Sequence, residues 1–422
     1  MTVCSVRHRK GCLTVALLLA SVSVWAQAAP PDPATTLKQA FMAAWARQPE
    51  AQSQAARQEA AAARRQATHS WTPEPVSLEL SIKSDRLTGN HGSSEIEAGL
   101  ALPLWLPGER ARSGALADAE VRADASRVRA AQLRTAASVR ESYWQWQRSR
   151  GEHALALERL GNAQQLAADV AKRVKAGDLA RADQHQADGA VAMAEVGLAE
   201  AVSALAGAAQ QFRALVGAAP VAAALDVGAQ TESLPAGAAD AVRLESSHPA
   251  LSELVDRAGV ARRAADLTRV QTRSNPELTL AAATDRGAVG EPYQQSITLG
   301  IRIPFGSDSR NRAKRFTAQA ELIEAEAQLD LEQARLLAEQ DSARVRLQSA
   351  QAQLKAADKR SQLARESRSF FQKSYQMGEA DLPTRLRIEL EAAEAQRQAS
   401  RARIELAAAV SNLRQALGLL PE

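Results

Sequence analysis

The chain has 422 residues, of which 45% are hydrophobic but only 4% are aromatic. Most apolar residues are alanine and leucine, which favour helices, so we expect long, closely packed helices and not a compact enzyme core with a deep pocket. The 52 basic and 48 acidic residues are interspersed and leave a net charge of +4. Such a pattern argues against nucleic acid as a partner.

The N-terminal segment (1–28) has the pattern of a secretory signal peptide. A basic section and an apolar run over 13–24 precede Ala26-Gln27-Ala28, a small-x-small cleavage pattern. The run is short for a membrane span, so cleavage is favoured over an uncleaved anchor. Both cysteines, Cys4 and Cys12, lie in this segment. We therefore expect an exported chain without disulfides, thiolate metal sites or a cysteine nucleophile.

The remaining chain is predicted to be a tandem duplication of one structural repeat, over 29–217 and 240–422. A Gly-, Ala- and Pro-rich linker over 218–239 joins the two repeats. Landmarks recur at an offset of about 200 residues, and an ordered series of six is hard to obtain by chance. The pairs are Gln48-Pro49-Glu50 with His248-Pro249-Ala250, Pro75 with Pro276, Leu102-Pro103-Leu104 with Ile303-Pro304-Phe305, Gly108 with Gly306, Gly177 with Gly378, and Leu215-Val216-Gly217 with Ala416-Leu417-Gly418.

Each unit is expected to begin with a helix, over about 35–70 and about 238–273, and to continue into two short strands. Strict alternation of apolar and polar residues predicts these strands, and polar, glycine-containing loops separate them. The expected strands cover about 75–84 and 94–104 in the first unit, and about 276–284 and 294–305 in the second.

Two interpretations fit these strands: a small soluble sheet with one buried face, or part of a transmembrane barrel. Charged residues on one face suit a water-filled lumen, and aromatic residues near the strand ends suit membrane interfaces. Those aromatic residues are Trp71, Trp105, Tyr293 and Phe305. Four strands cannot close a barrel, and open edges are not tolerated in lipid, so other copies of the chain must complete the sheet.

Long helices follow the strands in both units. No proline interrupts 108–176 or 311–377, which at 1.5 Å per residue allows roughly 100 Å of helix in each. Gly177 and Gly378 stand where helix C-caps are expected, and a second helix then returns to about 216 or 417.

A signal peptide followed by two copies of helix, strand, strand, long helix, glycine-marked turn and returning helix resembles the TolC family of outer-membrane efflux proteins. The resemblance covers the mature chain. It implies a mainly α fold with a small β part: a homotrimer with a TolC-like α-barrel tunnel and a 12-stranded outer-membrane β-barrel. It also implies the cell outer membrane as location, with a large periplasmic portion, contact with outer-membrane lipid, and a periplasmic adaptor and inner-membrane RND pump as partners.

In the family the two helix turns form the periplasmic tip, where adaptor hairpins dock. The matching docking residues are Arg173, Gly177, Asp178, Leu179, Gly378, Glu379, Asp381 and Leu382. Physically, such a tip is expected to expose a leucine between flanking charges. Asp183 and Tyr375 match gate positions, and we expect them to hydrogen-bond in the closed state. Thr384 and Arg387 stand where well-known members place an aspartate pair, so an acidic constriction is not expected.

Motifs of catalysis are missing: there is no P-loop, G-x-S-x-G, H-E-x-x-H or C-x-x-C, and the histidines are scattered. We expect no enzyme activity, no cofactor and no metal site. The predicted role is a passive efflux conduit for small solutes, leaning towards the heavy-metal cation (CzcC-like) group. A channel for type I protein secretion and a periplasmic helical adaptor or rod remain as alternatives.

Overall fold

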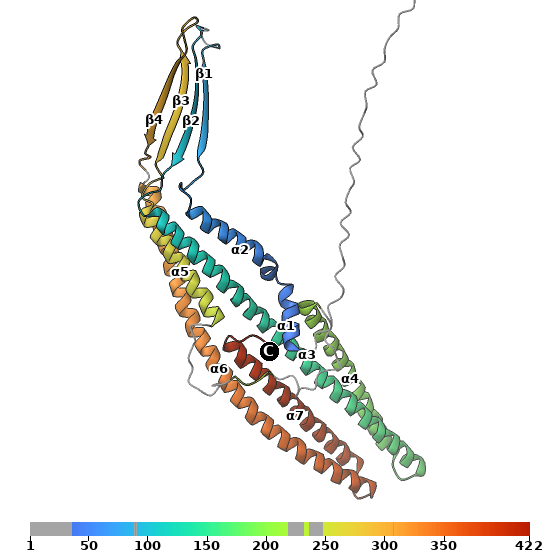
Figure 1. Ribbon diagram of the computed structural model, residues 1–422. Coiled ribbons are helices and arrows are strands. Elements are labelled where there is room, and N and C mark those ends of the chain that lie inside the picture. The colour runs from blue at the N-terminus through green and yellow to red at the C-terminus, as the bar shows by residue number, and fades with distance from the viewer. Residues whose placement is uncertain (1–35, 88, 90, 218–231, 236–247, 307) are drawn as a thin grey trace, which may run out of the picture.

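The computed structural model describes residues 36–87, 89, 91–217, 232–235, 248–306 and 308–422. The predicted signal peptide and most of the predicted linker lie outside these residues. The molecule is elongated: a narrow sheet stands at one end, and long helices run from it to the other end (Figure 1).

The order of helix, two strands, long helix and shorter helix occurs twice. The first set comprises α1 (Leu37–Ala46), α2 (Pro49–Thr68), β1 (Ser77–Ser84), β2 (Ser94–Pro103), α3 (Glu109–Ala176) and α4 (Arg181–Val216). The second set comprises α5 (Pro249–Val270), β3 (Glu277–Arg286), β4 (Gln294–Arg302), α6 (Asp308–Gln376) and α7 (Leu382–Ala416). With 68 and 69 residues, α3 and α6 are each about 100 Å long.

The helix expected over about 35–70 is in fact two helices, α1 and α2. Gln48 adopts an extended conformation (φ −71°, ψ 139°), and Pro49 occupies the first turn of α2. Proline disfavours the helical region for the residue before it and lacks an N–H, but it is well placed at a helix start. The chain therefore breaks before Pro49. Pro249 starts α5 in the same way.

The four strands form one antiparallel sheet in the order β1-β2-β3-β4. Each strand overlaps the range that the alternation predicts. One register row joins Leu78, Leu100, Leu280 and Leu299 across the whole sheet, so the alternation of all four strands is in phase. As the two outer strands, β1 and β4 each have a neighbour on one side only.

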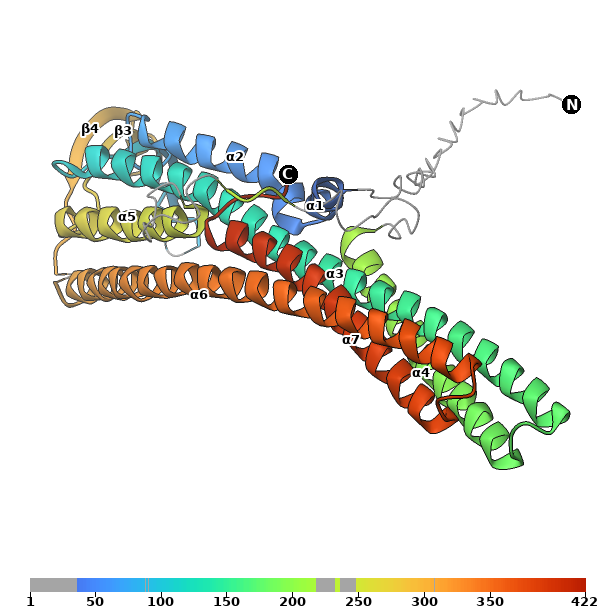
Figure 2. The same cartoon turned by 90° about the horizontal axis from the view of Figure 1, so that it is seen from below.

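Below the sheet the helices pack as antiparallel pairs, α3 with α4 and α6 with α7, which Figure 2 shows side by side. The main buried cluster lies midway along α3, where α1, α4 and α7 meet it. Five of the few aromatic side chains are buried there, and the ring centroids of two of them, Tyr143 and Trp146, lie 6.2 Å apart. The five are Phe41, Tyr143, Trp144, Trp146 and Phe212. This cluster holds α1 and the two helix pairs together near the middle of α3.

Helix α4 is unusual because it is apolar but poorly covered. It is the one helix among the described residues that is long and apolar enough to cross a membrane by length and composition, and only 11% of its most apolar window is buried. Met193 and Val196, for example, are each 60% exposed. Because α4 packs along α3, its open face is a lateral surface of the helical part.

Candidate functional site

The two helix pairs end in turns of the same geometry. In the α3–α4 turn, Gly177 has a φ of +88° and its N–H donates to the carbonyl oxygen of Val174 (3.1 Å). In the α6–α7 turn, Gly378 has a φ of +79° and donates to the carbonyl oxygen of Tyr375 (3.2 Å). Glycine takes this left-handed conformation without a side-chain clash, which explains why it closes both turns. We call these two turns and the first residues of α4 and α7 the tip.

An aspartate caps the start of each returning helix. Asp183 Oδ2 accepts a hydrogen bond from the Ala180 N–H (3.0 Å), and Asp381 Oδ1 accepts one from the Thr384 N–H (3.1 Å). The hydrogen bonds from Thr384 also hold the pKa of the Asp381 carboxyl below its ordinary value. These bonds satisfy backbone groups that would otherwise lack partners at a helix end.

Tyr375 is the centre of the tip's interior. The Arg173 and Arg385 guanidinium carbons lie 4.7 and 4.8 Å from its ring centroid, and the side chain is only 2% exposed. Arg173 Nη1 also donates to the Tyr375 carbonyl oxygen (3.1 Å). Burial raises the pKa of the Tyr375 hydroxyl, which has no hydrogen-bond partner among the described residues. Arg173 on α3, Tyr375 on α6 and Arg385 on α7 thus tie both helix pairs together at the tip.

The expected hydrogen bond between Asp183 and Tyr375 is absent from the protomer. Asp183 uses its carboxylate to cap α4, and no described residue bonds the buried Tyr375 hydroxyl. Arg385, which the sequence analysis did not single out, contacts Tyr375 instead. Arg385 is the fourth residue of α7, and nothing in the neighbouring sequence indicates that it will stack on a ring from another helix.

The expectation of an exposed leucine at the tip is wrong for Leu382. Its side chain is 2% exposed and packs with Tyr375 in a small hydrophobic cluster, and Leu179 is half-buried against that cluster. The charges of Asp178 and Glu379 do face solvent. Leu382 points inward because it packs on the ring of Tyr375, which comes from α6. The sequence of either turn by itself does not reveal this contact between two helices.

The two positions that depart from the family pattern both lie at the start of α7. Thr384 is half-buried and held by its N–H bond to Asp381. Arg387 is exposed and pairs with Glu391 on its own helix (2.7 Å). Such a pair adds little stability because water screens it.

The sheet has one apolar face, and that face is uncovered. Leu80, Ile82, Ile297 and Leu299 are 70–80% exposed. Five further large apolar residues of this face are each more than 40% exposed: Leu78, Ile96, Leu100, Leu280 and Ile301. Leu102 and Leu278, on the same face near the helix end, are half-buried. An apolar surface of this size does not belong in water and indicates contact with lipid or protein.

The opposite face of the sheet is polar. Lys83 pairs with Glu95 (3.6 Å) near the hairpin end, and Arg302 pairs with Glu277 (3.5 Å) near the helix end. Glu97 lies between them and takes part in no ion pair among the described residues. Apolar and polar side chains thus alternate along every strand, as they do in barrels with a water-filled interior.

Three of the four singled-out aromatic residues lie at the helix end of the sheet. Trp71 and Phe305 are 94% and 84% exposed, and Trp105 is half-buried, with its Nε1–H donating to the Ser70 carbonyl oxygen (3.3 Å). Tyr293 lies at the hairpin end, where the Arg286 guanidinium carbon is 5.0 Å from its ring centroid. The four residues therefore stand at both ends of the strands.

Groups for catalysis or metal binding are not gathered in the described part of the chain. It contains no group of three or more His, Cys, Asp or Glu side chains that could hold a metal ion. His185 lies exposed on α4 near the tip, whereas His248 is buried before α5.

Comparisons with known proteins agree with this geometry. Residues 42–218 match the family model described as outer membrane efflux protein. A solved structure of CusC superposes with a TM-score of 0.76 at 20% identity, over 91% of this chain and 92% of that chain. VceC from Vibrio cholerae gives 0.71 at 20% identity, over 92% and 97%. The open state of the MtrE outer membrane channel from Neisseria gonorrhoeae gives 0.71 at 18% identity, over 91% and 89%. No curated protein matches by sequence.

The protomer therefore has the fold of outer-membrane channel proteins: mainly α, with a small antiparallel sheet. The match to the outer membrane efflux protein family covers residues 42–218, and the likeness of fold to the solved channels extends over about nine-tenths of the chain.

Proposed function

We propose that three copies of this chain form the outer-membrane channel of a tripartite efflux system. The channel is a passive conduit for small solutes across the periplasm and the outer membrane. The observation that carries the proposal is the four-stranded sheet with its uncovered apolar face and two open edges, β1 and β4. Three such sheets supply twelve strands, and closing them in a ring leaves no edge in lipid.

In this arrangement the apolar face of the sheet contacts outer-membrane lipid, and the polar face lines the lumen. The exposed rings of Trp71 and Phe305 lie at the periplasmic interface, and Tyr293 lies at the outer one. Tryptophan and tyrosine, which have an apolar body and a polar edge, are favoured at such interfaces, and Phe305 adds an apolar ring at the same level. A soluble adaptor or rod would have to leave the apolar face in water, so the same face argues against that alternative.

The tip is the proposed site of adaptor docking and of gating. Docking uses the glycine turns and the residues around them, Arg173, Gly177, Asp178, Leu179, Gly378, Glu379 and Asp381, whereas Leu382 is buried and supports the turn from inside. The gate residues are Asp183, Tyr375, Thr384 and Arg387. With Leu382 turned inward, the exposed charges of Asp178 and Glu379 offer the recognition surface. Opening requires Tyr375 to separate from Arg173 or Arg385.

A periplasmic adaptor and an inner-membrane RND pump complete the proposed system, and heavy-metal cations are the proposed cargo. The cargo rests on the resemblance to the CzcC-like group alone, because a passive conduit leaves substrate choice to the pump. A type I secretion system could use the same channel. The test of cargo is efflux of zinc, cobalt and cadmium by cells that express the chain together with an RND pump and its adaptor, against cells that express the pump and adaptor without the chain.

The test of the proposed channel is extraction of outer membranes in detergent, mass measurement and reconstitution in a planar bilayer. A trimer that conducts ions supports the proposal. A monomer that fractionates with the soluble periplasm overturns it.

A further inference from the structure

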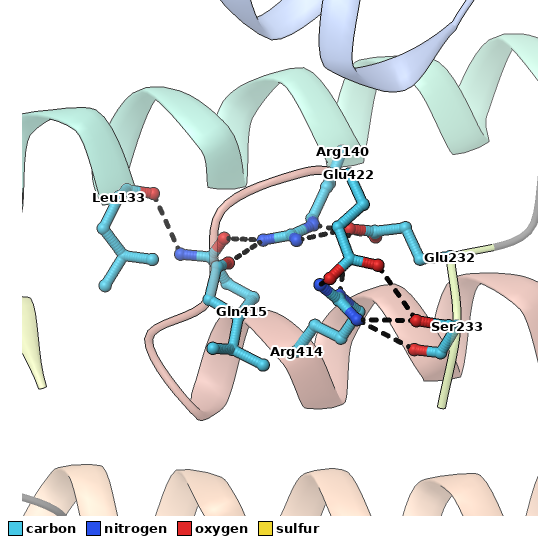
Figure 3. Close-up of polar contacts among 8 residues, drawn as sticks. Leu133, Arg140, Glu232, Ser233, Arg414, Gln415 and Glu422 are labelled. Carbon is cyan, nitrogen blue, oxygen red and sulfur yellow. Dashed lines mark hydrogen bonds and ion pairs between the residues drawn. The ribbon is translucent and has the colours of Figure 1, made fainter. Parts of the chain in front are cut away.

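Helix α7 connects the tip to a buried polar cluster in the middle of the molecule. Arg385, near the N-terminus of α7, lies on the Tyr375 ring at the tip. Arg414 and Gln415, at its other end, enter the cluster with Arg140 of α3 and Glu232 of the chain between the two units (Figure 3). Any displacement of α7 at the tip is therefore constrained by how firmly its far end is held.

Glu232 is shared between two buried arginines from the two halves of the chain. Arg140 Nε and Nη2 donate to Glu232 Oε2 and Oε1 at 3.0 and 2.6 Å, and Arg414 Nε lies 3.3 Å from Oε1. The side chains of Glu232 and Arg140 are each 1% exposed, and that of Arg414 is 4% exposed. A bidentate pair of this kind is strong and directional.

Further hydrogen bonds around this core also join α7 to α3. Arg140 Nη1 donates to Gln415 Oε1 (2.6 Å), and Gln415 Nε2 donates to the Leu133 carbonyl oxygen (2.9 Å). Glu422 also meets Arg414 (2.5 Å), but its side chain is 61% exposed. Among the described residues of this cluster, Glu232 is therefore the buried carboxylate that contacts both arginines.

Nearer the tip, the polar contacts between α3 and α7 are of a weaker kind. Arg148 pairs with Glu405 (3.3 Å), and Gln396 donates to Glu158 (2.8 Å), and all four side chains are partly or fully open to solvent. Water screens exposed pairs, whereas losing one partner of a buried pair leaves an uncompensated charge. The polar attachment of α7 to α3 is thus strongest at the Arg414 end.

We propose that Glu232 is a positioning residue that fixes this end of α7, so that opening of the tip is a swing of α7 about the Arg140–Glu232–Arg414 cluster. The inference rests on the proposed function only in taking the tip as the gate. Weakening the cluster frees the fixed end of α7 and loosens the contact of Arg385 with Tyr375 at the opposite end. Glu232 itself need not touch the gate.

Two variants test this in the full-length protein purified in detergent. Glu232→Gln keeps the shape of the side chain but leaves Arg140 without a counter-charge and Arg414 with the exposed Glu422 alone. Arg414→Met keeps the balanced Arg140–Glu232 pair, and so preserves folding, while it frees α7 from Glu232. The control is Arg403→Met, which removes the exposed pair of α7 with Asp358 (2.7 Å).

The measurements are amide hydrogen exchange over residues 376–385 and closed-state conductance in a planar bilayer. We expect both Glu232→Gln and Arg414→Met to speed exchange at the tip at least threefold and to raise the closed-state conductance, with Arg403→Met unchanged. Wild-type exchange at the tip in Arg414→Met overturns the inference, even if the variant melts at a lower temperature. If the wild-type protein conducts no ions, the proposed function fails, and exchange at the tip still decides whether Glu232 holds α7.

Discussion

Arg140 and Glu232 are 92 residues apart in the chain, yet they meet through two parallel hydrogen bonds of 3.0 and 2.6 Å. Both side chains are buried, so neither charge is compensated by water. We expect Arg140→Met to lower the free energy of unfolding by about 3–5 kcal/mol, because it leaves a buried carboxylate with Arg414 alone. Arg403→Met, at an exposed pair, should cost less than about 1 kcal/mol. Chemical denaturation of the purified protein measures both, and equal losses would contradict the prediction.

Tyr375 stabilises the tip through its ring and not through its hydroxyl. Tyr375→Phe should therefore leave the melting temperature unchanged or slightly raised, since it removes a buried hydroxyl without a partner. Tyr375→Leu should cost about 1–3 kcal/mol, because two guanidinium–ring contacts are lost. Thermal unfolding and single-channel conductance compare the two. If Phe is as damaging as Leu, the hydroxyl has a partner in the assembled protein.

Neighbouring residues of β1 should respond in opposite ways to a positive charge. Leu80→Arg places a cation on the apolar face and should cost about 2–4 kcal/mol of stability in the membrane. Ser81→Arg places the same group on the polar face and should be tolerated. The amount of protein in the outer-membrane fraction reports the difference. Equal loss for both variants would show that the two faces are not lipid and lumen.

Stability should fall as the medium becomes mildly acidic because of His248. Burial lowers the pKa of this imidazole below its ordinary value of 6.5. The unfolded chain then binds the proton more readily than the folded one, so the contribution is fully present above pH 6.5 and is lost as the pH falls below it. Denaturation at pH 7.5 and pH 5 should show a smaller drop for His248→Gln than for the wild type. An identical drop would assign the effect to other groups.

Two glycines should respond oppositely to substitution by alanine. Gly177 has a positive φ, so Gly177→Ala should cost about 1–2 kcal/mol and distort the tip. Gly189 lies inside α4 with open space around the position of a Cβ atom. Gly189→Ala should therefore stabilise the protein by about 0.5–1 kcal/mol. Thermal unfolding distinguishes the two, and loss of adaptor binding in Gly177→Ala alone would link the turn to docking.

The elements that could be predicted from the sequence are those with a local signal. Alternation marked the four strands, and Gly177 and Gly378 marked the ends of the long helices. The break before Pro49 also has a local signal, the proline itself, but we expected a continuous helix there. These features follow from the backbone preferences of a few adjacent residues.

The contacts that could not be predicted join residues distant in sequence. Nothing around Glu232 indicates that it will lie between Arg140 and Arg414, because the pairing depends on how α3 and α7 pack. Arg385 on the Tyr375 ring is a second example. The expected Asp183–Tyr375 bond in the closed state stays a prediction; in the single chain Asp183 instead accepts the Ala180 N–H.

The open edges of β1 and β4 have a consequence for how the protein is made and measured. In the proposed trimer, the last hydrogen bonds of each sheet come from neighbouring chains, so forming the sheet and joining the subunits are a single reaction. The melting temperature of the protein should therefore rise with protein concentration. A newly exported chain at low concentration would keep its edge strands unpaired and its apolar face uncovered. It would therefore be open to proteolysis and aggregation until it assembles with two further copies.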